Sequence, residues 1–259
     1  MSTVRQGDFS ELAKDYRHRP GYSEQVLRRL AVHVRATSSG FTVADVGAGT
    51  GKLTELLANE GLRGHAVEPN DAMRQEGIRT MGHSTAFGWR AGTAEATGLP
   101  AQSMDWVLMA SAFHWTDQAR ALAEFHRILK PGGFFTALWN PRHIERSPLE
   151  QQIEALIARI VPDLQRVSSG SRACTSTLAE TLVASGHFDN LLFLEGEHDL
   201  VMDRSRYIGV WRSVNDVQSQ AGPERFRQIV EGIEELLGER DQVLVPYLTR
   251  AWTVQKKGV

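Results

Sequence analysis

Three glycines at alternate positions, Gly47, Gly49 and Gly51, follow directly on a short β-branched run, residues 41–46. A turn of this kind has no Cβ and tolerates positive φ, so its backbone can approach a ligand closely. The periodic segment 52–59 begins at once, and a helix N-terminus offers free N–H groups to the same ligand. These residues therefore predict a strand, a turn that cradles a polar ligand, and a helix.

The spacing of the glycines narrows the class of ligand. A dinucleotide-binding turn has the pattern G-x-G-x-x-G, but Lys52 occupies the place of its third glycine. A P-loop requires Gly-Lys-Ser/Thr, whereas Leu53 follows Lys52 here, and Val46 stands where its first glycine would be. What remains is a G-x-G-x-G turn with an acidic residue, Asp45, two positions before it.

Two carboxylates accompany the turn. Glu68 ends the next short apolar run. A carboxylate there can accept both hydrogen bonds from a vicinal ribose diol, which is why nucleotide-binding folds place an acid about 20 residues further on. Asp45 has two interpretations, a contact to the ligand or a cap on the following helix, and the sequence favours neither.

Composition limits the other classes of protein. With 259 residues, 41% of them hydrophobic, the chain can form one core, and we predict a single domain over residues 1–259. The net charge of −2 gives no basic stripe, so nucleic acid is not the expected partner. The single cysteine, Cys174, excludes an intrachain disulfide and a thiolate-rich metal site, and we predict no metal.

No segment has the pattern of a membrane span or of a secretion signal. The longest apolar run, residues 106–113, is far shorter than the ~20 residues that a span needs. Residues 1–10 carry charge and no apolar stretch. We therefore expect a cytoplasmic protein with no membrane partner, while the oligomeric state has no signature in the sequence.

Hydrophobic periodicity predicts the elements that position these residues. Strands are expected at 41–46, 65–68, 85–90, 104–110 and 134–139, with helices between them. This alternation predicts an α/β fold, a Rossmann-like doubly wound sheet. Two later strands, 191–202 and 243–256, complete a mostly parallel sheet of seven strands.

The segments outside this alternating core are mostly helical. Residues 1–40 contain two amphipathic patterns separated by the Pro-Gly pair at 20–21, and we expect them to form a helical lid. Residues 141–190 and 203–240 are predicted helical elaborations between the late strands. The core, residues 41–140, would then bind the ligand of the glycine turn, and the elaborations would hold a second molecule.

Five features in this order resemble the class I S-adenosylmethionine (SAM) methyltransferases, over about the first 140 residues. They are Asp45 with the glycine turn, Glu68, the segment 92–95 followed by Leu99-Pro100, Asp105 with residues 113–115 after its strand, and the turn 129–133. The tyrosine- and arginine-containing segment 16–22 and the pair His114-Trp115 resemble the small-molecule branch, which includes trans-aconitate and ubiquinone-type methyltransferases. In that branch an N-terminal tyrosine and arginine close over the cofactor.

The resemblance implies SAM as cofactor and S-adenosylhomocysteine as product. The family usually has Asp where this chain has Thr93. The cofactor contacts that it implies are Tyr16, Arg19, Asp45, Gly47, Ala48, Gly49, Glu68, Pro69, Thr93, Ala94, Ala110 and Phe113.

The expected reaction is an in-line transfer of a methyl group to an O, N or carboxylate acceptor on a small molecule. His114 follows a buried strand at its carboxyl end, where open α/β sheets bind ligands, and is our candidate catalytic base. With a carboxylate acceptor it would only position the substrate. The expected walls of the substrate pocket are Tyr22, Trp115, Trp139, Arg142 and Trp211.

Three alternatives remain open. The chain could bind SAM without transferring methyl, as a cyclase or a structural partner. It could be a nicotinamide dehydrogenase, against which Lys52 argues. It could also methylate nucleic acid or protein, which the near-neutral charge and the lack of an Asn-Pro-Pro-Tyr-like motif disfavour.

Overall fold

The computed structural model describes residue 16 and residues 18–35, 40–82, 84–166 and 170–258. The first predicted helix, around residues 9–16, lies outside these residues except for Tyr16. The part of the lid that is described consists of Tyr16, residues 18–22 and one helix.

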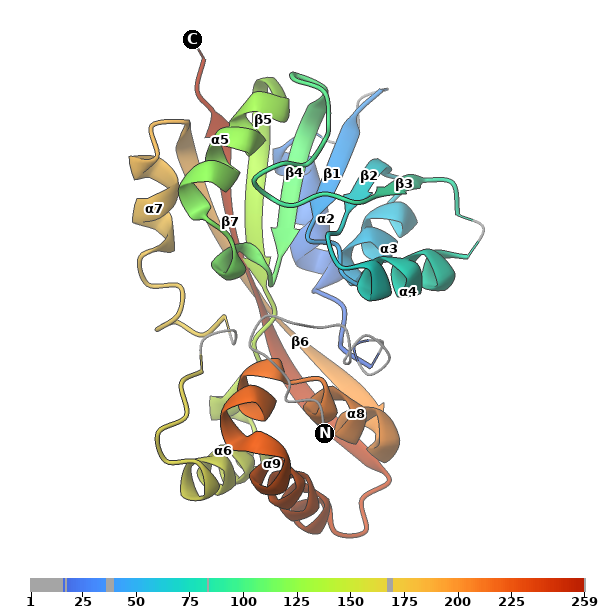
Figure 1. Cartoon of the computed structure of the whole chain (residues 1–259), viewed down its shortest axis with the longest axis vertical. Coiled ribbons are helices and arrows are strands. Elements are labelled where there is room, and N and C mark those ends of the chain that lie inside the picture. The colour runs from blue at the N-terminus through green and yellow to red at the C-terminus, as the bar shows by residue number, and fades with distance from the viewer. Residues whose placement is uncertain (1–15, 17, 36–39, 83, 167–169, 259) are drawn as a thin grey trace.

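A single seven-stranded sheet, in the order β3-β2-β1-β4-β5-β7-β6, organises the molecule (Figure 1). Its strands are β1 (Thr42–Val46), β2 (Arg63–Val67), β3 (Phe87–Arg90), β4 (Met104–Ala110), β5 (Leu129–Trp139), β6 (Phe188–Asp203) and β7 (Gln242–Lys256). The first five pair in parallel, and β7 is antiparallel to both of its neighbours. The predicted α/β fold with a mostly parallel, doubly wound sheet is confirmed.

Helices cover both faces of the sheet. They are α2 (Glu24–His33), α3 (Lys52–Asn59), α4 (Asp71–Met81), α5 (Gln118–Ile128) and α7 (Leu178–Ala184). α2 and α3 bury their apolar sides in a core on one face, with Trp106 of β4. α5 and α7 bury theirs in a second core on the other face, with Phe135 of β5. Since α2 belongs to this core, only the residues before it are placed to act as a lid.

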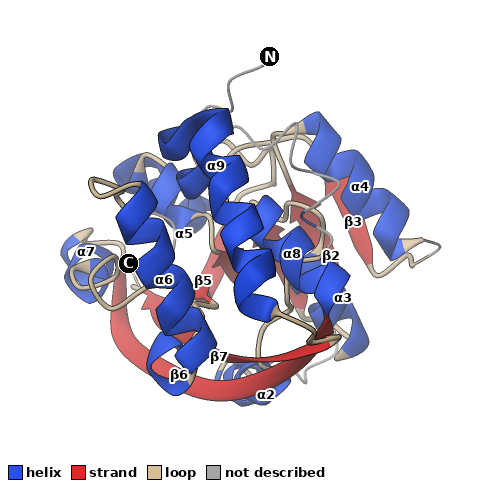
Figure 2. Cartoon of the chain, turned by 90° about the horizontal axis from the view of Figure 1, so that it is seen from below, coloured by secondary structure: helices blue, strands red, loops and turns tan. Residues whose placement is uncertain are grey.

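A helical lobe lies beyond one end of the sheet (Figures 1 and 2). It contains α6 (Pro148–Ile160), α8 (Arg204–Arg212) and α9 (Asn215–Leu237). These helices share a third apolar core with the ends of β6 and β7, including Trp211, Ile233 and Val245. α6 of the first predicted elaboration and both helices of the second therefore meet in one lobe, although β6 separates them in the sequence. α7, which also belongs to the first elaboration, packs on the sheet instead.

Helix starts follow their capping residues. Ser147 accepts a hydrogen bond from the N–H of Glu150, with Pro148 at the first helical position, as its capping-box pattern predicts. The similar pattern at Thr177 is not a cap, because no side-chain hydrogen bond forms there. The sequence of residues 177–180, Thr-Leu-Ala-Glu, also predicts a capping box, and that prediction is wrong.

Two element boundaries differ from the sequence prediction. β5 begins at Leu129 rather than at 134, because Leu129 pairs with Met104 before a register shift. The apolar stripe 226–237 predicts a helix that starts near Pro223. In α9 a further helical part, from Asn215, precedes it, and the non-helical Gly222 (φ 73°, ψ 167°) separates the two parts. Only glycine adopts this conformation readily, so the expected helix begins directly after it.

No helix among the described residues is both long and apolar enough to cross a membrane.

Candidate functional site

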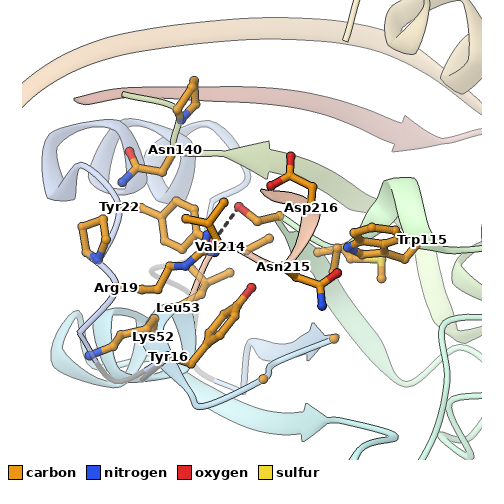
Figure 3. Close-up of a pocket in the computed structure, with 18 of the residues that line it drawn as sticks. Tyr16, Arg19, Tyr22, Lys52, Leu53, Trp115, Asn140, Val214, Asn215 and Asp216 are labelled. Carbon is orange, nitrogen blue, oxygen red and sulfur yellow. Dashed lines mark hydrogen bonds between the residues drawn. The ribbon is translucent and has the colours of Figure 1, made fainter. Parts of the chain in front are cut away.

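A cavity of about 970 Å³ lies at the carboxyl ends of the parallel strands and extends toward the helical lobe (Figure 3). We call the part lined by the glycine turn, Glu68 and Thr93 the turn end. The part lined by residues of the lobe and of β7 is the far end, with Arg142, Glu154, Arg166, Asp216 and Tyr247. Open α/β sheets bind ligands at this edge.

The glycine turn is fixed by the neighbouring strand. The N–H groups of Gly47 and Ala48 both donate to the carbonyl oxygen of Val67, at 2.8 and 3.1 Å. Gly47 has a φ of 69°, and a Cβ there would lie 3.0 Å from the Cβ of Ala112. A side chain is therefore excluded both by conformation and by space, and the backbone itself forms the cavity wall.

Glu68 braces the turn from the end of β2. Its Oε2 accepts a hydrogen bond from the N–H of Gly49, and its Oε1 one from the N–H of Asn70, both at 2.8 Å. Burial raises the pKa of this carboxyl group above its usual value. Each carboxylate oxygen can accept about two hydrogen bonds, so Glu68 can still accept two from a ligand in the cavity.

Asp45 contacts the following helix through a side chain but does not cap it, since Gly51 is the N-cap of α3. This residue is fully buried, and its Oδ2 accepts a hydrogen bond from the hydroxyl of Thr54 in the first turn of α3, at 2.6 Å. Burial raises the pKa of Asp45 to about 7. Asp45 also lines the cavity, and no described residue donates a hydrogen bond to its Oδ1. It thus joins β1 to α3 and leaves one oxygen on the ligand side.

The residues before α2 close one side of the cavity. Arg19 donates two hydrogen bonds to Ser213, at 2.7 and 2.8 Å, and its guanidinium lies 4.6 Å from the ring centre of Tyr16. The hydroxyl of Tyr22 donates to Ser111, and Asn140 donates to the carbonyl oxygen of Gly21. This segment therefore bridges the sheet and the α8–α9 junction, residues 213–216.

Most other predicted cofactor residues reach the turn end. Pro69, Thr93, Ala94 and Ala110 line the cavity. The hydroxyl of Thr93 accepts a hydrogen bond from the N–H of Ala96, so its side chain stabilises its own turn. Phe113 does not line the cavity, because it is fully buried in the core beside α5.

His114 lies behind the cavity wall. Its Nδ1 accepts a hydrogen bond from the indole N–H of Trp139 at 3.3 Å, and its ring packs against Trp115 at 4.7 Å between centres. No described residue bonds its buried Nε2. Burial lowers the pKa of His114 to about 4. Trp115 lines the cavity while His114 does not, so this geometry favours His114 as the support of Trp115 rather than as a base.

The low pKa of His114 has a measurable consequence. In the unfolded chain its pKa is about 6.5, so the native state binds fewer protons between pH 6.5 and 4 and loses stability as the pH falls through that window, by roughly 3 kcal/mol at most. In an NMR titration, we expect the ring resonances of His114 to report a neutral imidazole down to about pH 4. His114→Phe should flatten this part of the stability profile; an inflection of His114 near pH 6.5 would contradict the assignment.

Two of the predicted pocket tryptophans also lie behind the wall. Trp139 packs edge-on against Trp252 in the core, and Trp211 is fully buried in α8. Trp211 acts on the cavity through Arg142, whose guanidinium lies 3.9 Å from its ring centre. Tyr22 and Arg142, by contrast, line the cavity as predicted from sequence.

Arg142 is held by a buried acid. Its Nε lies 3.4 Å from Oε2 of Glu150, which is 1% exposed, and the hydroxyl of Tyr207 donates to the other oxygen at 2.6 Å. The negative charge of Glu150 raises the pKa of Arg142 in spite of burial. The guanidinium therefore stays charged at the cavity wall with its orientation fixed.

Several lining residues were missed from the sequence. Ser111 has a positive φ of 51° directly after β4, which turns its hydroxyl toward Tyr22. Arg166, Asp216 and Tyr247 come from a loop, from α9 and from β7. No motif marks them, and only the packing of the lobe brings them together.

Known proteins share the central part of this chain. Residues 44–137 match the model of the family described as "Methyltransferase domain". An uncharacterized methyltransferase of Mycobacterium tuberculosis is 37% identical over 143 residues, 55% of each chain. A ubiquinone/menaquinone biosynthesis C-methyltransferase of Methylobacterium nodulans is 33% identical over 148 residues, 55% of this chain and 58% of the relative. The chain thus spans about half the length of the curated relatives that it matches.

Solved structures share its fold over most of its length. A methyltransferase structure from Anaeromyxobacter dehalogenans gives a TM-score of 0.62 at 20% identity and covers 92% of this chain and 97% of that one. Phosphoethanolamine N-methyltransferase 2 of Haemonchus contortus, in complex with S-adenosyl-L-methionine, gives 0.56 at 15% identity over 96% of this chain and 57% of that one. Residues 44–137 therefore match the methyltransferase domain family, and the chain has the class I SAM-dependent methyltransferase fold.

Proposed function

We propose that the protein transfers a methyl group from SAM to a small molecule. The observation that carries this proposal is Glu68, a buried carboxylate that braces the glycine turn and keeps hydrogen-bonding capacity at the turn end of the cavity. Such a carboxylate suits the two hydroxyls of a ribose. The residues that we assign to the cofactor line this end together, except for Phe113.

Bound SAM would supply a methyl group already activated by the sulfonium. The main role of the protein would then be to orient the acceptor toward the methyl group. Such orientation can lower the activation barrier by roughly 7–11 kcal/mol when the geometry is tight. Glu68 and the turn would hold the nucleoside, and Arg19 with Tyr16 would close over it. Trp115 and Tyr22, which line the cavity, offer aromatic faces to positive charge.

The shape of the cavity supports a small acceptor. Side chains from residues before α2 and from the α8–α9 junction meet at the cavity, where Val214 lies beside Tyr22 and Arg19 (Figure 3). Arg19 and Ser213 connect these two sides directly. An acceptor must therefore fit within the far end, which favours a small molecule over a nucleic acid or a folded protein.

Calorimetry with SAM and S-adenosylhomocysteine tests the proposal, and NADH serves as the control ligand. We expect both SAM compounds to bind with micromolar affinity and NADH not to bind. No heat at millimolar SAM would overturn it. Binding without S-adenosylhomocysteine formation on a broad panel of small amines, alcohols and acids would favour a SAM-binding protein that does not transfer methyl.

A further inference from the structure

Asp216 is a buried carboxylate on the cavity wall, and no residue that the structure describes donates a hydrogen bond to it. It lies in the first turn of α9, and its side chain is 0% exposed. Burying an ionised carboxylate without donors is costly, so a site of this kind is completed by a donor from elsewhere.

Arg166 does not meet this need. Its Nη1 donates to both oxygens of Glu154, at 2.8 and 3.0 Å. Its Nε lies 3.4 Å from Oδ2 of Asp216, an ion pair without a hydrogen bond. His114 also faces Asp216, but burial lowers its pKa so far that the ring is neutral at pH 7. The carboxylate thus has one cationic neighbour, which it shares with a second acid.

The ion pairs around Asp216 leave one carboxylate without a cation of its own. Arg142 and Glu150 form one pair, and Arg166 lies between Glu154 and Asp216, so two cations face three anions. The deeper part of the cavity therefore favours a ligand that brings a positive charge.

Other charged side chains also line the cavity. Arg19 carries a positive charge there and is hydrogen-bonded to Ser213. Arg250 is paired with Glu195 at 2.8 Å. At the rim, Arg172 and Glu145 both line the cavity with side chains more than four-fifths exposed and carry opposite charges. None of these groups forms an ion pair or a hydrogen bond with Asp216.

We propose that the acceptor is a small molecule with an amino group, and that Asp216 turns one oxygen into the cavity to bind its ammonium. The inference rests on the proposed function. Trp115 and Tyr247, which also line the cavity, provide aromatic faces for such a cation. Figure 3 shows Asp216 and Asn215 between Trp115 and the side chains of Tyr16 and Arg19.

The reaction balances with Asp216 as proton acceptor. The ammonium gives one proton to the carboxylate, and the freed nitrogen lone pair forms the new N–C bond. The C–S bond of the cofactor breaks with its electron pair on sulfur. The product leaves as a methylated ammonium ion, and Asp216 returns its proton to water. Asp216 then replaces His114 as the group that touches the acceptor.

Three probes with the same ring and different head groups test this inference: 2-phenylethylamine, 2-phenylethanol and 3-phenylpropionate. Calorimetry is done at pH 7 on protein saturated with S-adenosylhomocysteine. We expect the amine to bind about tenfold or more tightly than the other two, since hydrogen bonds to a charged group are the strong ones. Asp216→Asn should remove this preference.

Glu231→Gln is the matched control. It removes one negative charge from the same helix, at an exposed position paired with Arg227, and should leave the preference intact. If Asp216→Asn fails to fold, the order of the three affinities in the wild type still decides. A carboxylate preference, equal affinities, or no amine binding at 10 mM overturns the inference; retained S-adenosylhomocysteine binding would show that the proposed function stands.

Discussion

Glu68→Ala is expected to weaken SAM binding by about 100-fold or more. The wild-type carboxylate would accept two hydrogen bonds from the ribose, and hydrogen bonds to a charged group contribute about 1.5–3 kcal/mol each. The variant also removes the acceptor of the Gly49 N–H, which belongs to the turn itself. Calorimetry with SAM and with S-adenosylhomocysteine measures the loss.

Glu55→Gln serves as the control, because Glu55 lies on the exposed side of α3 just after the turn. It removes the same charge without touching the cavity and should change SAM affinity less than about threefold. A thermal melt of each variant separates lost binding from lost structure. Near-normal SAM affinity in folded Glu68→Ala would remove the ribose assignment.

Gly64→Ala is expected to destabilise the fold by at least about 3 kcal/mol, at the upper end of what overpacking usually costs. A Cβ on Gly64 would lie 1.8 Å from the carbonyl oxygen of Val43 on the neighbouring strand β1. The obstacle is backbone, so neither partner can rotate away, and β1 and β2 must separate. For a chain of this size the melting temperature should fall by about 6–12 °C.

Gly88→Ala is the matched control on the adjacent strand β3. There the nearest atom to a new Cβ is Nδ1 of His65, at 3.6 Å, an ordinary contact. We expect a change within about 1 kcal/mol. Denaturant unfolding followed by circular dichroism compares the two variants; equal midpoints for both would mean that the close approach of β1 and β2 does not limit stability.

The turn end could be predicted from the sequence because local rules determine it. The glycine spacing, the acid after the second strand and the alternation of strands with helices are all short-range patterns, and parallel strands bring their carboxyl ends to one edge. Gly49 and Glu68, separated in the sequence, meet at 2.8 Å for this reason.

The far end could not be predicted in the same way. Arg166, Asp216 and Tyr247 come from three separate segments, and nothing in their local sequence marks them. Their meeting depends on the core shared by α6, α8 and α9, which is a result of tertiary packing. The orientation of the His114 ring also could not be predicted from the sequence, because it depends on a hydrogen bond from the indole of Trp139 on the next strand.

The antiparallel ribbon of β6 and β7 has a consequence for how the lobe can move relative to the sheet. The two strands pair from Phe188 with Lys256 to Asp203 with Gln242, with one irregularity near Asp189, while β7 pairs with β5 only over its second half. The two strands therefore form one continuous ribbon that runs from the sheet into the helical lobe (Figure 1). A rotation of the lobe away from the sheet would have to bend this continuous ladder, whose two strands carry hydrogen bonds along nearly their whole length. We therefore expect the lobe and the sheet to move largely together, with the cavity between them keeping its shape.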